Sequence, residues 1–222
     1  MSLDAAAQKE LVGRRAAELV EDGMRVGLGT GSTVRHTTEA LADRDLDLLC
    51  VPTSVETDRL ARHLGLKVTD PDAVPSLDIA VDGADEVDPA LNLVKGGGGA
   101  HFRERLVAEM ADRFVVVVDE SKVVEQLGDF GVPVEVMSFG QDVVARRLQA
   151  EGAVDVHVRP TKSDNGNLIL DADFGPLADP VELATRLTPI TGLIAHGIFP
   201  GALVSEVLVG RADGTIETRT HG

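Results

Sequence analysis

Residues 81–104 read VDGADEVDPALNLVKGGGGAHFRE. This stretch places acidic side chains, one lysine and four consecutive glycines between an apolar segment and a segment with helical spacing. Glycine loses much conformational freedom on folding, so a run of glycines indicates a tight turn or a close approach of backbone to a ligand. Charged groups and accessible backbone coincide here, which predicts a functional site.

Segments typical of strands and helices alternate around this stretch. We expect helices at residues 5–22, 54–64 and 103–113, a further helix that opens after the glycine turn within residues 29–44, and strands at 24–28, 46–51, 66–68, 77–81 and 114–118. Such alternation is typical of an α/β fold with a doubly wound, mostly parallel sheet. Ligands of such sheets bind outside the carboxyl ends of the strands.

The pattern changes after Gly128. The remaining segments read strand, helix, strand, strand, helix, strand, which matches a ferredoxin-like α+β unit. A hairpin around Asp213 and Gly214 follows, and we expect it to return to the first sheet. The predicted organisation is a Rossmann-like domain of residues 1–127 plus 203–222, with an inserted βαββαβ domain of residues 128–202.

The composition is strongly acidic. The 222 residues carry a formal net charge of −16, and 43% are hydrophobic, which suffices for a substantial core. No basic face is visible that could neutralise phosphates of a nucleic acid. Lysine is scarce, at five residues, and the acids are spread along the chain. This resembles a salt-adapted protein, since salt screens self-repulsion, although an ordinary acidic protein has the same features.

The location and the single cysteine follow from the same sequence. No segment has the pattern of a signal peptide, and no apolar run is long enough to cross a bilayer, so we expect a cytoplasmic protein without membrane contact. Cys50 lies in an apolar run, which favours a buried structural thiol over a nucleophile or a metal ligand.

Residues 27–34, GLGTGSTV, form a predicted strand-to-helix turn. Backbone N–H groups and hydroxyls at a helix N-terminus suit a phosphate. The spacing matches neither a dinucleotide fingerprint nor a Walker loop. Taken alone the motif is weak, because Thr30 and Ser32 could simply cap the helix.

The acids after the strand at 77–81 allow several interpretations. Their spacing excludes an EF-hand, while a magnesium site using two of the carboxylates stays open. Asp82 and Asp85 should lie at the carboxyl edge of the sheet. We expect Glu86 and Asp88 to be solvated surface residues.

Glu104 falls in the first turn of a predicted helix, where an ionised carboxylate is favoured. This position suits a general base, although pairing with Arg103 or Arg105 would explain it equally well. Together with Lys95 and the glycine run, these residues describe a site for a small phosphorylated substrate, with acid–base chemistry and no cofactor.

The motifs GTGST, VDGADEVD and KGGGGAHFRE, in this order and spacing, resemble the signatures of the ribose-5-phosphate isomerase A family. DESKVVEQLG, PVEV, the DNGN turn and EVLVG extend the resemblance over nearly the whole chain. It implies an aldose–ketose isomerase that interconverts ribose 5-phosphate and ribulose 5-phosphate through an enediolate, in the non-oxidative pentose phosphate pathway. It implies no metal and no cofactor, and it suggests a homodimer or homotetramer.

The resemblance also assigns roles to residues. Glu104, nine residues after Lys95, is implied to move the proton between C1 and C2. Asp82 and Asp85 are implied in ring opening and hydroxyl binding, with Lys95 beside the enediolate. Lys122 and, less securely, Lys9 match phosphate ligands. The remaining substrate-binding positions are Thr30, Gly31, Ser32, Thr33, Gly83, Ala84, Gly96, Gly97 and Gly98.

Two departures from the family pattern are visible. His101 and Phe102 replace a more familiar Ala/Leu-Thr pair, and Glu120 stands where alanine is common. We expect His101 to be a loop residue without a chemical role. The alternative function is a sugar-phosphate sensor that binds the ligand on a related fold without turnover.

Overall fold

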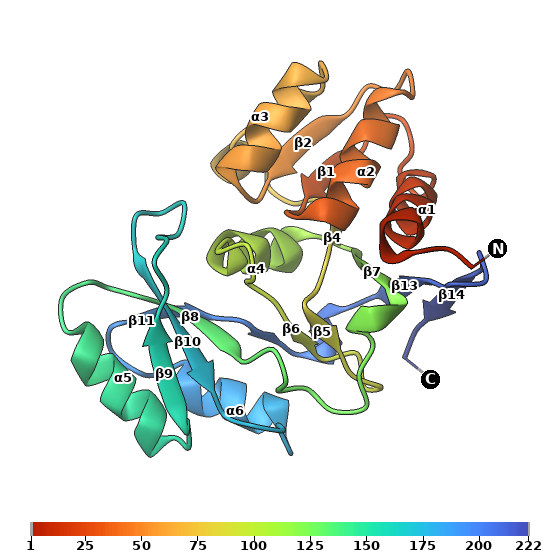
Figure 1. Ribbon diagram of the computed structural model, residues 1–222. Helices are drawn as coiled ribbons and strands as arrows, with labels where there is room; N and C mark the ends of the chain where they lie inside the picture. The colour runs from red at the N-terminus through yellow and green to blue at the C-terminus, as the bar shows by residue number, and fades with distance from the viewer. Residues whose placement is uncertain (1, 222) are drawn as a thin grey trace. The chain divides into compact units, whose positions relative to one another are not determined.

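The computed structural model describes residues 2–221, and the chain divides into two compact units (Figure 1). The first unit holds residues up to Ala84, Arg103–Val123 and the C-terminal segment from Leu203. The second holds Asp85–Phe102 and Val124–Ala202.

The first unit is built on a seven-stranded sheet in the order β14-β13-β7-β4-β1-β2-β3. All neighbours are parallel except β14 against β13, so the C-terminal hairpin returns to this sheet as predicted. The strands are β1 (Arg25–Leu28), β2 (Leu49–Pro52), β3 (Lys67–Val68), β4 (Ile79–Asp82), β7 (Phe114–Asp119), β13 (Glu206–Gly210) and β14 (Ile216–Arg219). The predicted doubly wound, mostly parallel sheet is confirmed.

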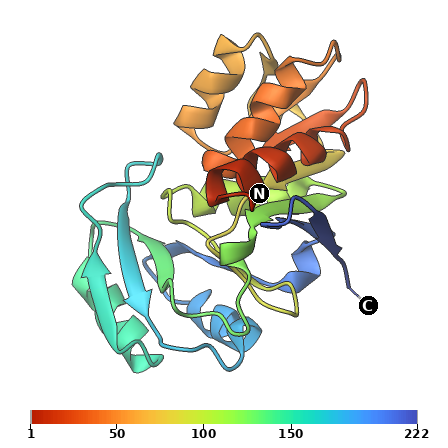
Figure 2. The same cartoon turned by 45° about the vertical axis from the view of Figure 1, so that its right-hand side comes forward.

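The helices of this unit pack on the sheet through small and branched residues. They are α1 (Ala5–Ala17), α2 (Ser32–Ala42), α3 (Val55–His63) and α4 (His101–Met110), with short 3-10 turns η1 (Pro71–Ala73), η2 (Glu120–Lys122) and η3 (Gly201–Leu203). Figures 1 and 2 both show α1 and α2 side by side. Gly13 permits this close approach, because a Cβ there would lie 2.7 Å from the Thr33 carbonyl oxygen. The first helix ends at Ala17, five residues earlier than expected.

Cys50 lies in the core of this unit with no exposed surface. Burial raises the pKa of its thiol to about 12, since a thiolate would lose its hydration there. The predicted structural thiol is confirmed.

The second unit contains a four-stranded antiparallel sheet in the order β11-β8-β10-β9. Its elements are β8 (Val132–Val136), α5 (Gln141–Ala150), β9 (Asp155–Val158), β10 (Leu168–Asp173), α6 (Pro180–Leu187) and β11 (Leu193–His196). Strand order and direction are those of the ferredoxin-like unit. That prediction is confirmed, and the inserted strands bury Val132, Val134, Val136 and Leu170 against Leu148 and Leu187 of its helices.

A three-stranded sheet, β12-β6-β5, also belongs to the second unit. It joins β5 (Glu86–Val87) and β6 (Leu93–Val94) to β12 (Ile198–Phe199). We expected residues 85–102 and 124–127 to belong to the first domain. They belong to the second unit instead. Two-residue strands carry too little periodicity to be recognised, and β12, the partner of β6, lies over one hundred residues away in the chain.

Within residues 2–221, no helix is long and apolar enough to cross a membrane.

Candidate active site

Asp82 ends β4 at the carboxyl edge of the first unit's sheet, as expected. Its Oδ1 accepts hydrogen bonds from the backbone N–H groups of Thr30 at 3.1 Å and Gly83 at 2.7 Å. Gly29 is required for this approach, because a Cβ there would lie 2.2 Å from the same oxygen. The structure therefore brings the aspartate and the start of the 30–33 loop together.

The 30–33 loop leads into α2, whose N-cap is Gly31 with φ of 116°. No side chain caps this helix, so capping does not explain Thr30 or Ser32. The Thr30 hydroxyl instead lies 2.8 Å from that of Thr53, at the end of the neighbouring strand. Ser32 is exposed and Thr33 is buried. Thus the loop keeps its helix N-terminus available to an anion, as a phosphate site requires.

Glu104 lies in the first turn of α4, and its side chain is buried. Val107 of this helix packs closely on Gly27 of β1. A Cβ on Gly27 would lie only 2.5 Å from the Val107 side chain. A carboxylate in a first turn is stabilised by the helix dipole, which suits a residue that must accept a proton.

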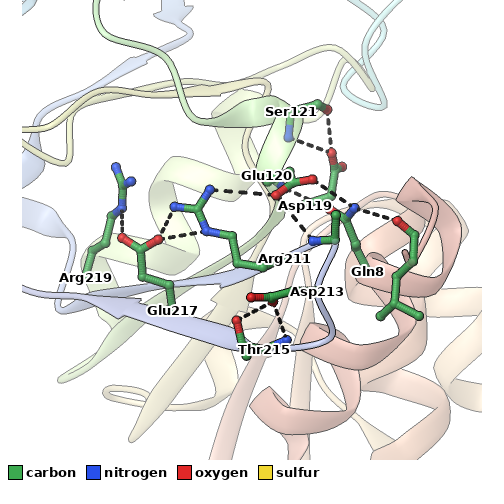
Figure 3. Close-up of polar contacts among 11 residues, drawn as sticks. Gln8, Asp119, Glu120, Ser121, Arg211, Asp213, Thr215, Glu217 and Arg219 are labelled. Atoms are coloured by element: carbon green, nitrogen blue, oxygen red, sulfur yellow. Dashed lines mark hydrogen bonds and ion pairs between the residues drawn. The ribbon is translucent and has the colours of Figure 1, made fainter. Parts of the chain in front are cut away.

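Lys9 and Lys122 lie on elements that one polar network links (Figure 3). Lys9 Nζ lies 3.8 Å from Asp119 Oδ2, and Asp119 caps η2, whose last residue is Lys122. Gln8 and Glu120 exchange two hydrogen bonds of 3.2 Å between α1 and η2. The structure thereby places both lysines beside the carboxyl end of β7.

Glu120 continues this network toward the C-terminal hairpin. Its Oε2 accepts from the Ala212 backbone N–H at 3.3 Å and lies 3.8 Å from Arg211 Nη1. Figure 3 shows Arg211 bridging Glu120 and Glu217. The residue that departs from the family pattern is thus anchored on both sides.

Asp85, Lys95 and the glycine run belong to the second unit. Asp85 Oδ2 accepts from the Gly97 backbone N–H at 2.8 Å, and a Cβ on Gly97 would lie 2.7 Å from Asp85 Oδ1. Lys95 is buried, its N–H donates to the Gly197 carbonyl at 2.8 Å, and its ammonium lies 5.6 Å from the centroid of the Phe199 ring. Gly97 and Gly98 are exposed. The glycine run is therefore an accessible backbone segment next to a buried cation.

The expectation that Glu86 and Asp88 are solvated is wrong. Both side chains are buried. Glu86 accepts from the N–H groups of Gly128 at 2.7 Å and Phe130 at 2.9 Å, and Asp88 accepts twice from Asn92 at 2.8 Å. These carboxylates close loops in the second unit, because buried backbone donors need acceptors that the short strands do not supply.

His101 is also not a loop residue. It is the first residue of α4 and is fully buried, and burial lowers the pKa of its imidazole to about 4. Its Nδ1 lies 2.7 Å from where a Cβ of Gly96 would be, so the ring packs beneath the glycine run.

Sequence reasoning missed several residues that hold the site. They are Thr53, Gln8, Asp119, Glu135 and Arg159. Glu135 is buried in β8 and accepts from Ser163, Asn165 and Asn167, which explains the DNGN turn. A glutamate inside the apolar run VPVEV was the one local signal.

The first unit contains two pockets of different size. One of about 640 Å³ is lined by Ser54, Asp70 and Arg103 among others, and by none of the predicted site residues. A smaller one of about 290 Å³ includes Gly31 and Ser32. Among residues 2–221 no three His, Cys, Asp or Glu side chains are grouped to hold a metal ion.

Comparison with known proteins identifies the family. The family model for ribose 5-phosphate isomerase A (phosphoriboisomerase A) matches residues 49–214. The protein belongs to the ribose-5-phosphate isomerase A family. The isomerase from Caulobacter sp. strain K31 is 45% identical over 220 residues, covering 95% of this chain and 96% of the relative.

Solved isomerase structures agree with this assignment. The enzyme from Neisseria gonorrhoeae superposes with a TM-score of 0.95 at 32% identity, and covers 99% of both chains. A ribose-5-phosphate isomerase in complex with phospho-erythronic acid has a TM-score of 0.95 at 34% identity, covering 99% of this chain and 100% of that one. The protein is accordingly an isomerase that interconverts ribose 5-phosphate and ribulose 5-phosphate, and a non-catalytic sensor is not favoured.

Proposed function

We propose that Glu104 is the base that carries the proton between C1 and C2 of the sugar phosphate, through a cis-enediolate. The observation that carries this proposal is the buried carboxylate in the first turn of α4, nine residues after Lys95. Removing a proton beside a carbonyl is slow unless the developing oxyanion is stabilised. Lys95 and the Gly98 N–H of the glycine run supply that stabilisation, while the Gly97 N–H donates to Asp85.

The same proposal assigns the remaining residues. Asp82 and Asp85 assist ring opening and bind sugar hydroxyls, with the backbone at Gly83 and Ala84 close to the sugar. Lys9, Lys122 and residues 30–33 hold the phosphate, so its binding energy positions the reacting carbons. The phospho-erythronic acid bound by the related isomerase is a phosphorylated sugar acid, which supports a site of this charge pattern.

Glu104→Gln tests the base. We expect kcat for ribulose 5-phosphate formation to fall by about 10²–10⁴-fold, because the amide cannot accept the proton. The inhibition constant of inorganic phosphate should stay within about threefold of the wild-type value. Glu109→Gln is the matched control, since Glu109 lies exposed on the same helix and pairs with Arg105. Near-normal turnover by Glu104→Gln would reject the assignment.

Lys122→Ala tests the proposed binding of the substrate phosphate in the same assay. We expect KM to rise by about tenfold or more with a smaller change in kcat, since a phosphate contact is present in both ground and transition states. Lys162→Ala, which removes an exposed lysine, is the control. An unchanged KM would remove Lys122 from this role.

We further infer that the enzyme works in the cytoplasm as a homodimer or homotetramer. A sugar-phosphate substrate and one buried, unpaired cysteine support an intracellular site of action. Exposed apolar residues of the second unit, including Met137 and Phe139, support an association surface.

A further inference from the structure

The carbonyl groups of the glycine run are held by an arginine that the sequence motifs do not include. Arg159 Nη1 donates to the carbonyl oxygens of Gly96 at 2.9 Å and Gly97 at 3.1 Å. Arg159 follows β9 directly and belongs, like the glycine run, to the second unit. One guanidinium nitrogen therefore fixes two successive peptide groups.

Arg159 is itself held in place from the neighbouring strand. Its Nε donates to Asp171 Oδ2 at 2.9 Å, and its Nη2 donates to Asp171 Oδ1. Asp171 lies in β10, which pairs antiparallel with β9 (Figure 1). A two-pronged pair of this kind fixes the plane of the guanidinium as well as its position. The Arg159 side chain is 15% exposed, so solvent competes little for its donors.

The direction of these carbonyls determines the direction of the N–H groups. In a trans peptide the C=O and N–H bonds point to opposite sides. The Gly96 carbonyl faces Arg159, and the N–H of the same peptide, on Gly97, donates to Asp85 at 2.8 Å. The Gly97 carbonyl also faces Arg159, so the Gly98 N–H points away from the guanidinium.

The Gly98 N–H is an available donor. Among residues 2–221 no acceptor for it is present, and Gly98 is exposed. Gly96 and Gly99 have positive φ values of 107° and 77°, a conformation in which glycine is unstrained but in which it also has alternatives of similar energy. The two bonds from Arg159 select one peptide orientation from these alternatives.

We propose that Arg159 is a positioning residue for isomerisation, which aims the Gly98 N–H at the oxyanion of the enediolate. This rests on the proposed function of the glycine run. Arg159 acts through protein atoms, namely the two loop carbonyls and the Asp171 carboxylate, and its positive charge behind the two carbonyls strengthens the polarity of the peptides. The inserted domain, for which the motifs predicted no site residue, thereby contributes to the chemistry.

Arg159→Gln, Arg159→Lys and the control Arg147→Gln test this role. Arg147 is matched because it lies in the same domain and also donates to a backbone carbonyl, that of Thr191 at 3.1 Å, away from the glycine run. We expect Arg159→Gln to lower kcat by about 10–100-fold, less than the about 10²–10³-fold cost of removing an oxyanion donor because the Gly98 N–H is misdirected and not removed, with KM within about threefold. Arg159→Lys should recover part of the loss, and Arg147→Gln should match the wild type.

Inhibition by two anions separates positioning from a general structural effect. Phospho-erythronic acid carries a carboxylate near the reacting end, whereas inorganic phosphate reports only the phosphate grip. We expect Arg159→Gln to raise the inhibition constant of phospho-erythronic acid by about tenfold and to leave that of inorganic phosphate unchanged. The double variant Arg159→Gln/Asp171→Asn, which removes the unpaired carboxylate, should show the same kcat loss.

Three results would overturn the proposal: unchanged kcat in Arg159→Gln, an equal rise of the inhibition constants of both anions, or full recovery of kcat in the double variant. Glu104→Gln is assayed in parallel. An active Glu104→Gln rejects the proposed base and leaves the Arg159 comparison readable from the two anions. An inactive Glu104→Gln with a fully active Arg159→Gln rejects the positioning role alone.

Discussion

The role of a single residue in this isomerase depends on the surroundings of its side chain more than on its chemical type. Glu86 is a buried acid that accepts from two backbone donors and thereby closes a loop, whereas the buried Glu104 lies in the first turn of a helix. His101 looks like an acid–base candidate in the sequence, but its imidazole is enclosed beneath Gly96. The location of each group, rather than its pKa as a free amino acid, assigns its role.

His101 predicts a specific pH dependence of stability. Its pKa is lowered from 6.5 in the unfolded chain to about 4 in the folded protein, chiefly by burial. Between these values the unfolded chain binds the extra proton, so the free energy of unfolding should fall as pH falls from 6.5 to 4. The loss attributable to this group is about 3 kcal/mol at most.

Urea unfolding between pH 7.5 and 4.5 measures this effect. We expect His101→Gln to be less stable than the wild type at pH 7.5 and to lose less stability on acidification. His157→Gln is the control, because His157 is exposed beside Asp155. Equal pH slopes for His101→Gln and the wild type would show that the imidazole is not neutral in the folded state.

At the scale of elements, short turns position the proposed phosphate ligands. Lys122 ends a three-residue 3-10 turn, which has little stability of its own. The Gln8–Glu120 pair ties this turn to α1, the helix that carries Lys9 (Figure 3). Glu120 therefore stabilises a turn that has little stability of its own.

Glu120→Ala should raise KM for ribose 5-phosphate by about threefold to tenfold, while kcat changes by less than about twofold. The reason is that both lysines lose a fixed mutual position, which affects ground-state and transition-state binding alike. Glu10→Ala is the control, because Glu10 is exposed on α1 and pairs with Arg14 of the same helix. A wild-type KM in Glu120→Ala would mean that η2 is held without the network.

At the scale of the whole molecule, the net charge of −16 opposes folding through self-repulsion. The lysines that remain include three at predicted site positions, so local positive charge must attract an anionic substrate against the overall field. Salt shortens the Debye length from about 10 Å at 0.1 M to about 3 Å at 1 M and weakens the repulsion.

We therefore expect the midpoint of urea unfolding at pH 7.5, and kcat/KM, to rise between 0.1 M and 1 M KCl. The effect on stability should shrink at pH 5, because the net charge is small near the isoelectric point of about 4.7. A protein equally stable and active at both salt concentrations would contradict the interpretation of the acidic composition as salt adaptation.

The sequence by itself determined the parallel sheet, the ferredoxin-like insertion and the order of the family motifs. These features depend on local periodicity and on turns, as in α6, where Asp179 caps the helix and Pro180 starts it. Boundaries shifted elsewhere, as at the end of α1, which stops at Ala17.

Only the tertiary structure decided how the site is supported. Arg159 and Gly97 are 62 residues apart, and Gln8 and Glu120 are 112 apart, so no local pattern connects them. The burial of Glu86 depends on backbone donors at Gly128 and Phe130 that sequence spacing does not place. Periodicity reports which side of an element faces the core, whereas the partner of a polar group depends on the three-dimensional meeting of distant segments.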